Sequence, residues 1–274
     1  MKTVLITGAS SGIGKATAQY FSAKGWNVAA TMRKPENETE LDKLQNVKLY
    51  QLDVTDENSI EVALQNSIDD FGQIDVIVNN AGYGTVGVFE AATQEQIKRQ
   101  FDTNVFGVMN VIRGILPHFR SKKEGTIINI TSMAGLITFP IYSLYHGTKW
   151  ALEGFSESLN FELRPLNIKV KCVEPGAIKT DFYDRSQDLL KNEGLTDYDN
   201  YQNVTFSNAQ NAGNNAPGPL VVAKKIYQAA TDSSFRLRYP VGNDSSILLF
   251  IRRIIPLSWF MAMVRLVIER GFKK

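Results

Sequence analysis

Short apolar runs rich in β-branched residues alternate along the chain with longer amphipathic stretches. Six runs have the length and composition of buried strands, namely TVLIT (3–7), NVAAT (27–31), VKLYQL (47–52), DVIVN (75–79), TIINIT (126–131) and IKVKCV (168–173). Runs without polar alternation are typical of a parallel sheet covered on both faces. The pattern therefore predicts an α/β fold, a doubly wound, Rossmann-like parallel sheet with right-handed crossovers, formed by residues 1–274 as a single domain.

Glycines mark the predicted ends of the intervening helices. A helix over Ile13–Lys24 is closed by Gly25, and one over Glu57–Phe71 is closed by Gly72. Near residues 200–219 the composition shifts to NYQNVTFSNAQNAGNNAPGP, which indicates a long polar loop. Only 55 residues follow this stretch, too few for a second domain, so we expect a mobile lid over about 183–219.

Composition favours a small-molecule enzyme over other classes of protein. The 30 basic and 28 acidic residues are spread along the chain and give a net charge of only +2, so no nucleic-acid partner is expected. Two histidines and one cysteine make a metal site improbable, and Cys172, inside a strand-like run, is expected to be a buried, inert thiol. The start MKTVLITG does not resemble a signal peptide, so a cytoplasmic location is expected.

The first predicted strand runs into a glycine-rich turn, TGASSGIG, and then into a helix. Glycines 8, 12 and 14 allow a sharp turn and a close approach of backbone to a ligand. The helix N-terminus that follows directs free N–H groups at the same place, as a pyrophosphate requires. The spacing G-x-x-x-G-x-G is neither the usual dinucleotide fingerprint nor a P-loop, and a plain strand-to-helix connection is the alternative.

A second candidate is YHGTK, in which Tyr145 and Lys149 are four residues apart near the start of a helical pattern. Residues four apart share a helix face. A phenol is a poor base at neutral pH unless a nearby positive charge favours its ionised form, so the spacing permits an acid/base pair. An ordinary polar helix start has the same spacing. His146 is turned about 100° away and is interpreted as an ordinary hydrogen-bonding partner or a surface residue.

Five motifs occur in order between residues 3 and 182: TGASSGIG, Asp53-Val54, Asn79-Asn-Ala-Gly82, YHGTK and Pro175-Gly176. Each follows a predicted strand, at the edge where open α/β sheets bind ligands. This ordered set resembles the short-chain dehydrogenase/reductase family. The resemblance implies an oxidoreductase of CH–OH groups that uses NAD(P), either carbonyl reductase or alcohol dehydrogenase, assembled as a homodimer or homotetramer.

The resemblance also assigns roles to residues of this chain. Tyr145 is implied to be the general acid/base, supported by Lys149, with Ser132 in NITSMAG as a hydrogen-bond donor to the substrate and Thr131 as the less favoured donor. Asn104 in FDTNVFG is implied to support a proton relay to the lysine, although an asparagine in a helix is also commonly solvent-facing or a helix irregularity. The implied cofactor contacts are Gly8, Ser10, Ser11, Gly12, Ile13, Gly14, Arg33, Asp53, Val54, Asn80, Ala81, Gly82, Tyr145, Lys149, Pro175, Gly176, Ile178 and Thr180.

Two of these cofactor positions carry further information. The position where a carboxylate would bind the ribose 2′-hydroxyl of NAD is Met32, and Arg33 follows it, which favours NADP(H) over NAD(H). Arg33 as an ordinary surface charge is the alternative, and Ser11 stands where some NADP-dependent relatives carry a basic residue. Asp53 resembles an adenine contact, but it would serve equally as the cap of a helix that begins near Asp56.

The substrate and the C-terminal tail are less determined. The segment Met133–Ser143, MAGLITFPIYS, predicts an apolar pocket beside Ser132 for a hydrophobic carbonyl or alcohol, or else simply core. The tail Ser245–Lys274 mixes arginines with apolar residues in a helical pattern, and its longest uncharged run, Ile254–Val264, has 11 residues, short of a membrane span. Packing over the active site or on another subunit is preferred to peripheral membrane contact. A 3-oxoacyl-carrier reductase and a non-catalytic nucleotide-binding sensor or scaffold remain alternative functions.

Overall fold

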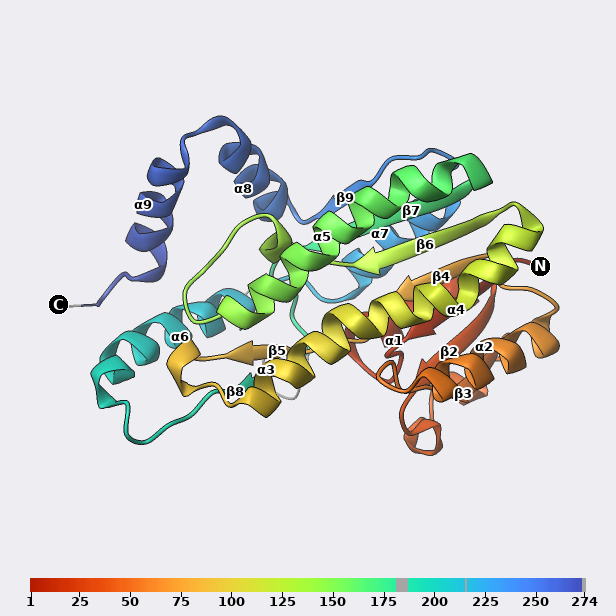
Figure 1. Ribbon diagram of the computed structural model, residues 1–274, viewed down its shortest axis with the longest axis horizontal. Helices are drawn as coiled ribbons and strands as arrows, with labels where there is room; N and C mark the ends of the chain where they lie inside the picture. The colour runs from red at the N-terminus through yellow and green to blue at the C-terminus, as the bar shows by residue number, and fades with distance from the viewer. Residues whose placement is uncertain (181–186, 215, 273–274) are drawn as a thin grey trace.

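The centre of the molecule is a seven-stranded parallel sheet in the order β3-β2-β1-β4-β6-β7-β9 (Figure 1). The computed structural model describes residues 1–180, 187–214 and 216–272. The strands of this sheet are β1 (Thr3–Thr7), β2 (Asn27–Met32), β3 (Val47–Gln51), β4 (Val76–Asn79), β6 (Gly125–Ile130), β7 (Ile168–Pro175) and β9 (Arg238–Val241). The doubly wound fold and all six strands expected from the sequence are confirmed, and β9 is an additional strand that the hydrophobic pattern did not indicate.

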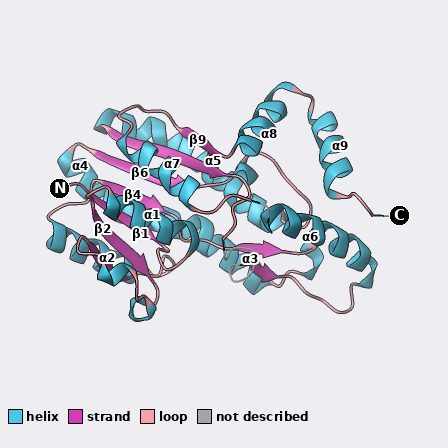
Figure 2. Cartoon of the chain, turned by 180° about the vertical axis from the view of Figure 1, so that it is seen from behind, coloured by secondary structure: helices cyan, strands magenta, loops and turns pink. Residues whose placement is uncertain are grey.

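Helices cover both faces of the sheet. The α-helices of the described residues are α1 (Gly12–Ala23), α2 (Glu57–Phe71), α3 (Gln94–Phe101), α4 (Gly107–Lys122), α5 (Ser143–Leu163), α6 (Asp199–Asn214), α7 (Leu220–Thr231), α8 (Asn243–Ile254) and α9 (Leu257–Ile268). Helices α4 and α5 pass in front of the sheet in Figure 1, and α1 and α7 lie on the opposite face, which Figure 2 shows from behind.

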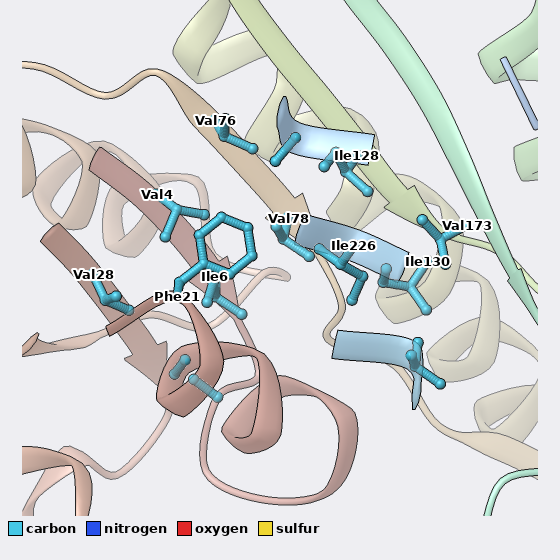
Figure 3. Packing of buried hydrophobic residues seen from close by; sticks show 14 of the residues in the cluster. Val4, Ile6, Phe21, Val28, Val76, Val78, Ile128, Ile130, Val173 and Ile226 are labelled. Carbon is cyan, nitrogen blue, oxygen red and sulfur yellow. The ribbon is translucent and has the colours of Figure 1, made fainter. Parts of the chain in front are cut away.

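The core forms because successive strand residues point to opposite faces of the sheet. In β1, Val4 and Ile6 pack toward α1 and α7, where they meet Phe21 and Ile226 (Figure 3). Leu5, between them, packs toward α2, α4 and α5. The runs lack polar alternation because both faces of each strand are buried in this way.

A smaller parallel sheet of two strands, β5 (Gly84–Val86) and β8 (Gln187–Leu189), lies beyond the main sheet with α6 nearby (Figure 1). Within the segment 183–219, predicted as a polar lid, residues 183–186 and 215 lie outside the described residues. The prediction of a loop over 200–219 is wrong for most of its length, because α6 covers Asp199–Asn214. The helix is held by tertiary bonds: Gln202 Oε1 accepts from the Val88 amide at 3.1 Å, and Asn208 Nδ2 donates to the Ile268 carbonyl at 2.8 Å.

The tail is helical, as its pattern indicated. Helices α8 and α9 stand at one end of the molecule, outside the layers of the main sheet, in both views (Figures 1 and 2). Phe260 and Val264 of α9 are buried against Ile137, in the segment that follows β6. Within the described part of the chain, none of the helices is long and apolar enough to cross a bilayer.

The order of strands reverses between β1 and β4, because the chain builds outward from β1 to β3 on one side and from β4 to β9 on the other. The crevice outside the carboxyl ends of strands at such a reversal is the usual ligand site of open α/β sheets. The turn after β1 and the Asn-Asn-Ala-Gly segment after β4 both lie there.

Candidate active site

The glycine-rich turn after β1 has a geometry that only glycine allows. Gly8 has φ +66° and Gly12 has φ +52°, both in the left-handed region. A Cβ on Gly8 would lie 2.9 Å from Ala81 Cα, and one on Gly14 would lie 2.2 Å from the Gly8 carbonyl oxygen. The backbone is therefore packed as closely as it can be at the start of α1, and the helix N-terminus meets the crevice with exposed Ser10 and Ser11 beside it. This cradle fits a pyrophosphate.

Hydrogen bonds join this turn to the end of β4. The Asn80 side-chain amide donates to the carbonyl oxygens of Thr7 and Gly8, at 2.9 and 3.0 Å. The Thr7 hydroxyl accepts from the backbone amides of Asn80 and Ala81, each at 3.0 Å. Neighbouring Gly82 lies against Asn104, because a Cβ on Gly82 would be 3.1 Å from Asn104 Oδ1. The two motifs on either side of the strand reversal thus form one rigid unit.

Across the crevice, the segment after β7 approaches the same turn. A Cβ on Gly12 would lie 3.5 Å from Thr180 Cβ. Gly176 donates its amide to the Val241 carbonyl at 3.2 Å, and Ile178 is buried. Thr180 thus lies against the glycine-rich turn, and the cofactor contacts of Pro175, Gly176 and Ile178 stay predictions.

Arg33 and Asp53 lie at the ends of β2 and β3, on the far side of β1 from the catalytic candidates. Arg33 is exposed directly after β2. Asp53 Oδ1 accepts from the Thr55 amide at 2.9 Å and from its hydroxyl at 2.8 Å, while Val54 is buried. The alternative in which Asp53 caps α2 is wrong, because the cap is Asp56, which accepts from the amides of Asn58 and Ser59.

An ion cluster near the β2 end was not found by sequence reasoning. Lys15 of α1 lies 3.1 Å from carboxylate oxygens of both Glu38 and Glu40. Burial raises and hydrogen bonds lower the pKa of Glu38, with a net lowering. The cluster ties the segment after Arg33 to the first helix, and its members are too far apart in sequence for spacing alone to relate them.

Ser132 lies just beyond β6, on extended backbone at the start of a short 3₁₀ helix, Met133–Gly135. Its hydroxyl accepts from the Ala134 amide at 3.1 Å and donates to the Pro175 carbonyl at 3.2 Å. Thr131 instead turns its hydroxyl toward the Val173 carbonyl, at 3.1 Å. The hydroxyl of Ser132 is therefore oriented by the ends of two neighbouring strands.

Tyr145 and Lys149 lie in the first two turns of α5, as the sequence indicated. The Lys149 ammonium is 5.6 Å from the centroid of the half-buried Tyr145 ring, and it donates to the Ile130 carbonyl at 2.8 Å. Burial lowers the pKa of Lys149 to about 8, against an opposing effect of Glu153. A cation in this position favours the ionised form of an adjacent phenol.

Asn104 lies in a π-helical turn, Asp102–Phe106, between α3 and α4. It is buried and holds Tyr83 at both backbone groups, accepting from the amide at 3.1 Å and donating to the carbonyl at 2.8 Å. The same amide nitrogen lies 3.3 Å from the Thr148 hydroxyl, next to Lys149. The helix irregularity considered for Asn104 is thus present, and such turns are frequent at functional sites.

His146 is a structural residue of the core. Its Nδ1 lies 2.7 Å from the Ala134 carbonyl, and its Nε2 accepts from the Phe139 amide at 3.0 Å. Burial lowers its pKa, so the imidazole is neutral at physiological pH. The alternative of a surface residue is wrong, and His146 instead braces the loop that follows Ser132.

A buried acidic pair beneath the site was also missed from sequence. Glu153, one turn after Lys149, and Glu174 in β7 both approach the guanidinium of Arg238 in β9, at 3.1 and 3.4 Å. Burial, then repulsion from Glu153, raises the pKa of Glu174 to about 8. Arg238 belongs to the strand that the pattern did not indicate, which is why the cluster was not found. Cys172, nearby, is buried, and burial raises the pKa of its thiol well above its ordinary value.

The structure therefore brings the predicted residues to one edge of the main sheet, from β3 across to β7. Ser132, Tyr145, Lys149 and Asn104 gather at the β6 end, and the cofactor candidates extend from there toward β2 and β3. Their individual roles stay predictions. Among the described residues, no group of three or more histidine, cysteine or acidic side chains is placed to hold a metal ion.

Known proteins share this arrangement over most of the chain. A sequence model of the family described as short chain dehydrogenase matches residues 2–189. The uncharacterized oxidoreductase YusZ of Bacillus subtilis is 38% identical over 267 residues, which cover 94% of this chain and 95% of that protein. The 3-ketodihydrosphingosine reductase of Bacteroides thetaiotaomicron is 42% identical over 181 residues, covering 66% of this chain and 65% of the relative.

Solved structures agree. A short-chain dehydrogenase from Streptomyces avermitilis superposes with a TM-score of 0.83 at 33% identity and covers 98% of each chain. ElxO, solved with NADP bound, gives a TM-score of 0.74 at 30% identity, covering 90% of this chain and 99% of its own. The chain therefore belongs to the short-chain dehydrogenase/reductase family, whose members are oxidoreductases of CH–OH groups that use a nicotinamide dinucleotide.

Proposed function

We propose that this protein is an NADP(H)-dependent oxidoreductase that interconverts a carbonyl and a secondary alcohol on a small hydrophobic substrate. The observation that carries the proposal is the position of Lys149. Its buried ammonium lies beside the Tyr145 ring and binds the last carbonyl of β6, two residues before Ser132. A proton donor, a cation and a hydroxyl thus meet at the carboxyl edge of the sheet.

The residues divide the work as follows. When bound, the nicotinamide cofactor supplies a hydride in reduction and accepts one in oxidation. Tyr145 donates its phenol proton to the substrate oxygen in reduction and takes it back in oxidation. The Ser132 hydroxyl, whose single proton is directed at the Pro175 carbonyl in the structure, turns from that carbonyl to the same substrate oxygen and stabilises the charge that develops there. Lys149 favours the phenolate that remains, and Asn104 beside Thr148 supports the return of a proton toward the lysine.

Replacement of Tyr145 tests the mechanism directly. Tyr145→Phe removes the proton donor and leaves the ring, so turnover should be lost while NADPH binding, followed by fluorescence titration, stays nearly unchanged. Tyr142→Phe is the matched control, because its ring centroid is only 6.5 Å from that of Tyr145. Turnover that survives in Tyr145→Phe but is lost in Tyr142→Phe would show that the wrong tyrosine was assigned. Cofactor binding without turnover of any ketone or alcohol by the unaltered protein would favour the sensor alternative.

The preference for NADP(H) rests on Arg33, which is exposed at the end of β2 where a 2′-phosphate would lie, with no acidic residue at position 32. The NADP bound to ElxO supports the same choice. Arg33→Ala should raise the KM for NADPH about tenfold or more and leave that for NADH nearly unchanged. Lys34→Ala, the exposed neighbour, is the control. Better use of NADH than NADPH by the unaltered enzyme would contradict the preference.

The apolar segment after Ser132 supports a hydrophobic substrate. Met133, Ile137 and Phe139, within seven residues of Ser132, belong to an apolar cluster with the tail helices. The relative from Bacteroides thetaiotaomicron is named for the reduction of a ketone, 3-ketodihydrosphingosine, which supports a 3-keto compound as the first class to test. A 3-oxoacyl-carrier reductase remains the second candidate. Rates measured on ketones of increasing chain length, against a carrier-linked 3-oxoacyl compound, separate the two.

Assembly and location belong to the same proposal. Trp150 and Phe161 share one face of α5 and are 44% and 71% exposed, which supports a homodimer or homotetramer formed through that helix. Light scattering of Phe161→Glu, expected to show a lower mass, tests it.

A cytoplasmic location agrees with a lone buried cysteine that has no disulfide partner in the chain.

A further inference from the structure

Helix α9 is apolar around most of its circumference, yet only one face of it is covered. Phe260 and Val264 are buried against Ile137 and its neighbours. On the other side, Trp259 and Leu266 are 68% and 79% exposed. They are seven residues apart, so they lie on one stripe of the helix. A helix that is apolar all round normally has a partner on every face.

Helix α8 repeats the pattern. Ile247, Phe250 and Ile254 are all more than half exposed, and their i, i+3, i+7 spacing places them on one stripe. Leu248 and Leu249, between them, pack instead with the buried part of the tail. We call the five exposed residues Ile247, Phe250, Ile254, Trp259 and Leu266 the tail surface.

Positive charge accompanies the tail surface. Residues 245–274 contain six basic residues and one acidic residue, although the whole chain is close to neutral. Arg252 and Arg253 end α8, and Arg265 lies within α9. Among the salt bridges of the described residues, none neutralises Arg252 or Arg253. Arg253 and Arg265 thus flank the exposed stripes, whereas Arg252 lies on the opposite face of α8, with its guanidinium 5.7 Å from the centroid of the buried Phe260 ring.

We propose that the tail surface docks on an anionic lipid bilayer, with α8 and α9 lying in the interface and their arginines among the headgroups. Aromatic and aliphatic side chains on one stripe with arginines beside them are the features of helices that lie at this depth. The two helices have 12 residues each and are separated by Pro256, so neither reaches across the roughly 30 Å hydrocarbon core.

Charge also decides between a bilayer and a second copy of the chain. A symmetric dimer presents the same patch from both subunits. Two patches of like charge would then be brought together, each with six basic residues and only Glu269 to compensate them in this stretch. An anionic headgroup layer complements the same charges.

Docking would place the bilayer close to the substrate side of the active site. The inner face of α9 packs on Ile137, five residues after Ser132, and α9 is bound to α6 through Tyr201 and Glu269, whose side chains are 3.0 Å apart. The docked helices would therefore lie against the segment that follows Ser132. This consequence rests on the proposed function, whereas docking itself does not.

Vesicle flotation of the full chain tests the proposal. We expect the protein to float with vesicles of phosphatidylcholine and phosphatidylserine (7:3), at least ten times more weakly with pure phosphatidylcholine, and less in 0.5 M than in 0.1 M NaCl. Phe250→Asp and Trp259→Asp should each reduce binding about tenfold or more, and Arg253→Glu should reduce it only on the anionic vesicles. Phe89→Asp is the matched control, since Phe89 is also more than half exposed but lies outside the tail.

Retained NADPH binding and circular dichroism establish that each variant is folded. A lack of flotation by the unaltered protein overturns the proposal, and so does equal, salt-insensitive binding to both kinds of vesicle. Binding unchanged in both aspartate variants overturns the assignment of the tail surface. Light scattering tests the alternative of a second copy of the chain. If the unaltered protein does not bind vesicles and the particle mass is lower for Phe250→Asp and Trp259→Asp than for the unaltered protein, the tail surface is a contact between two copies. Ketone reduction measured without vesicles is independent of all these outcomes.

Discussion

The ammonium nitrogen of Lys149 donates a hydrogen bond of 2.8 Å to the backbone carbonyl oxygen of Ile130. Ile130 is the last residue of β6, so the bond joins the second turn of α5 to the strand that leads to Ser132. The charge beside Tyr145 is therefore fixed by the backbone of the sheet. Because its partner is a carbonyl, the position of this lysine does not depend on another side chain.

Replacement of Lys149 by Met should lower kcat by roughly a hundredfold or more, since the cation that favours the phenolate is lost. Steady-state reduction of a ketone with NADPH measures it. Lys48→Met is the control and should keep full activity. Lys48 is an exposed residue of the edge strand β3 and pairs with Asp70 of α2.

The same lysine predicts a pH dependence. Its pKa of about 8 in the folded protein means that the ammonium form prevails below pH 8 and is lost as the pH rises through that value. Reduction should therefore decline with an apparent pKa near 8, seen in kcat/KM, which reports the free enzyme. A profile that stays flat to pH 10 would show that the charge of Lys149 is not required.

Stability should also depend on pH, through Glu174. Its pKa is about 8 in the folded protein, against an ordinary value of 4.5, so between these limits the folded state holds a proton that the unfolded state releases. The free energy of unfolding therefore falls as the pH rises from 4.5 to 8. Glu174→Gln should remove roughly 1–3 kcal/mol of this fall, measured by urea unfolding at pH 5 and pH 8.

Glu157→Gln is the control for that experiment, because Glu157 pairs with the same Arg238 but is exposed to solvent. Its unfolding curves should shift little and equally at the two pH values. An identical pH dependence in Glu174→Gln and the unaltered protein would show that Glu174 is ionised in the fold.

Gly14→Ala should abolish NADPH binding or prevent folding, because the new Cβ would lie 2.2 Å from the Gly8 carbonyl oxygen. Gly154→Ala offers the opposite outcome. This residue is exposed within α5 and a Cβ there would meet nothing within 4 Å in the chain itself, so the unfolding free energy of the monomer should rise by about 0.5–1 kcal/mol. Gly154 shares the α5 face of Trp150 and Phe161, so a lower mass in light scattering would show that the added methyl group disturbs the proposed subunit contact. Isothermal titration and thermal unfolding of both variants measure the contrast.

Asn104→Ala should both destabilise the protein and slow the reaction, because it leaves the Tyr83 amide without its partner, while the Tyr83 carbonyl keeps its bond from the Gln100 side chain at 2.9 Å. We expect a loss of about 1–3 kcal/mol in unfolding free energy. Thr148→Val removes the third contact of Asn104 and the bond from the Thr148 hydroxyl to the Tyr145 carbonyl, and Thr148→Ser, which keeps a hydroxyl for both, is the control. If the relay matters, Thr148→Val lowers kcat with an unchanged melting temperature; unchanged kcat in that variant would leave Asn104 a purely structural role.

The main sheet was predictable because burial on both faces leaves a local signal, a run of apolar residues in each strand. Strand β9 carries no such signal, because its sequence is Arg-Tyr-Pro-Val. It is held in the sheet by parallel pairing with the neighbouring β7. Helix α6 was missed for a related reason. Its asparagine-rich sequence has little helical pattern, and bonds to Val88 and Ile268 from distant parts of the chain hold it.

The site divides in the same way. Its motifs are contiguous in sequence and could be found by spacing, as with Tyr145 and Lys149. The support beneath them is not contiguous, because Glu153, Glu174 and Arg238 come from three elements and meet only in the folded chain. Long-range ion clusters of this kind leave no mark on any short stretch of residues.

The small sheet of β5 and β8 has a topological consequence. Thr85 pairs with Asp188, so the two strands close a loop of about a hundred residues that contains Asn104, Ser132, Tyr145 and Lys149. An ion pair between the side chains of Arg99 and Asp188 adds a second contact beside this pair of strands. Every residue that we expect to handle the proton thus lies between the two strands of the small sheet, in a stretch whose strands β6 and β7 belong to the main sheet, so this stretch is joined to itself at its ends as well as to the main sheet along its length.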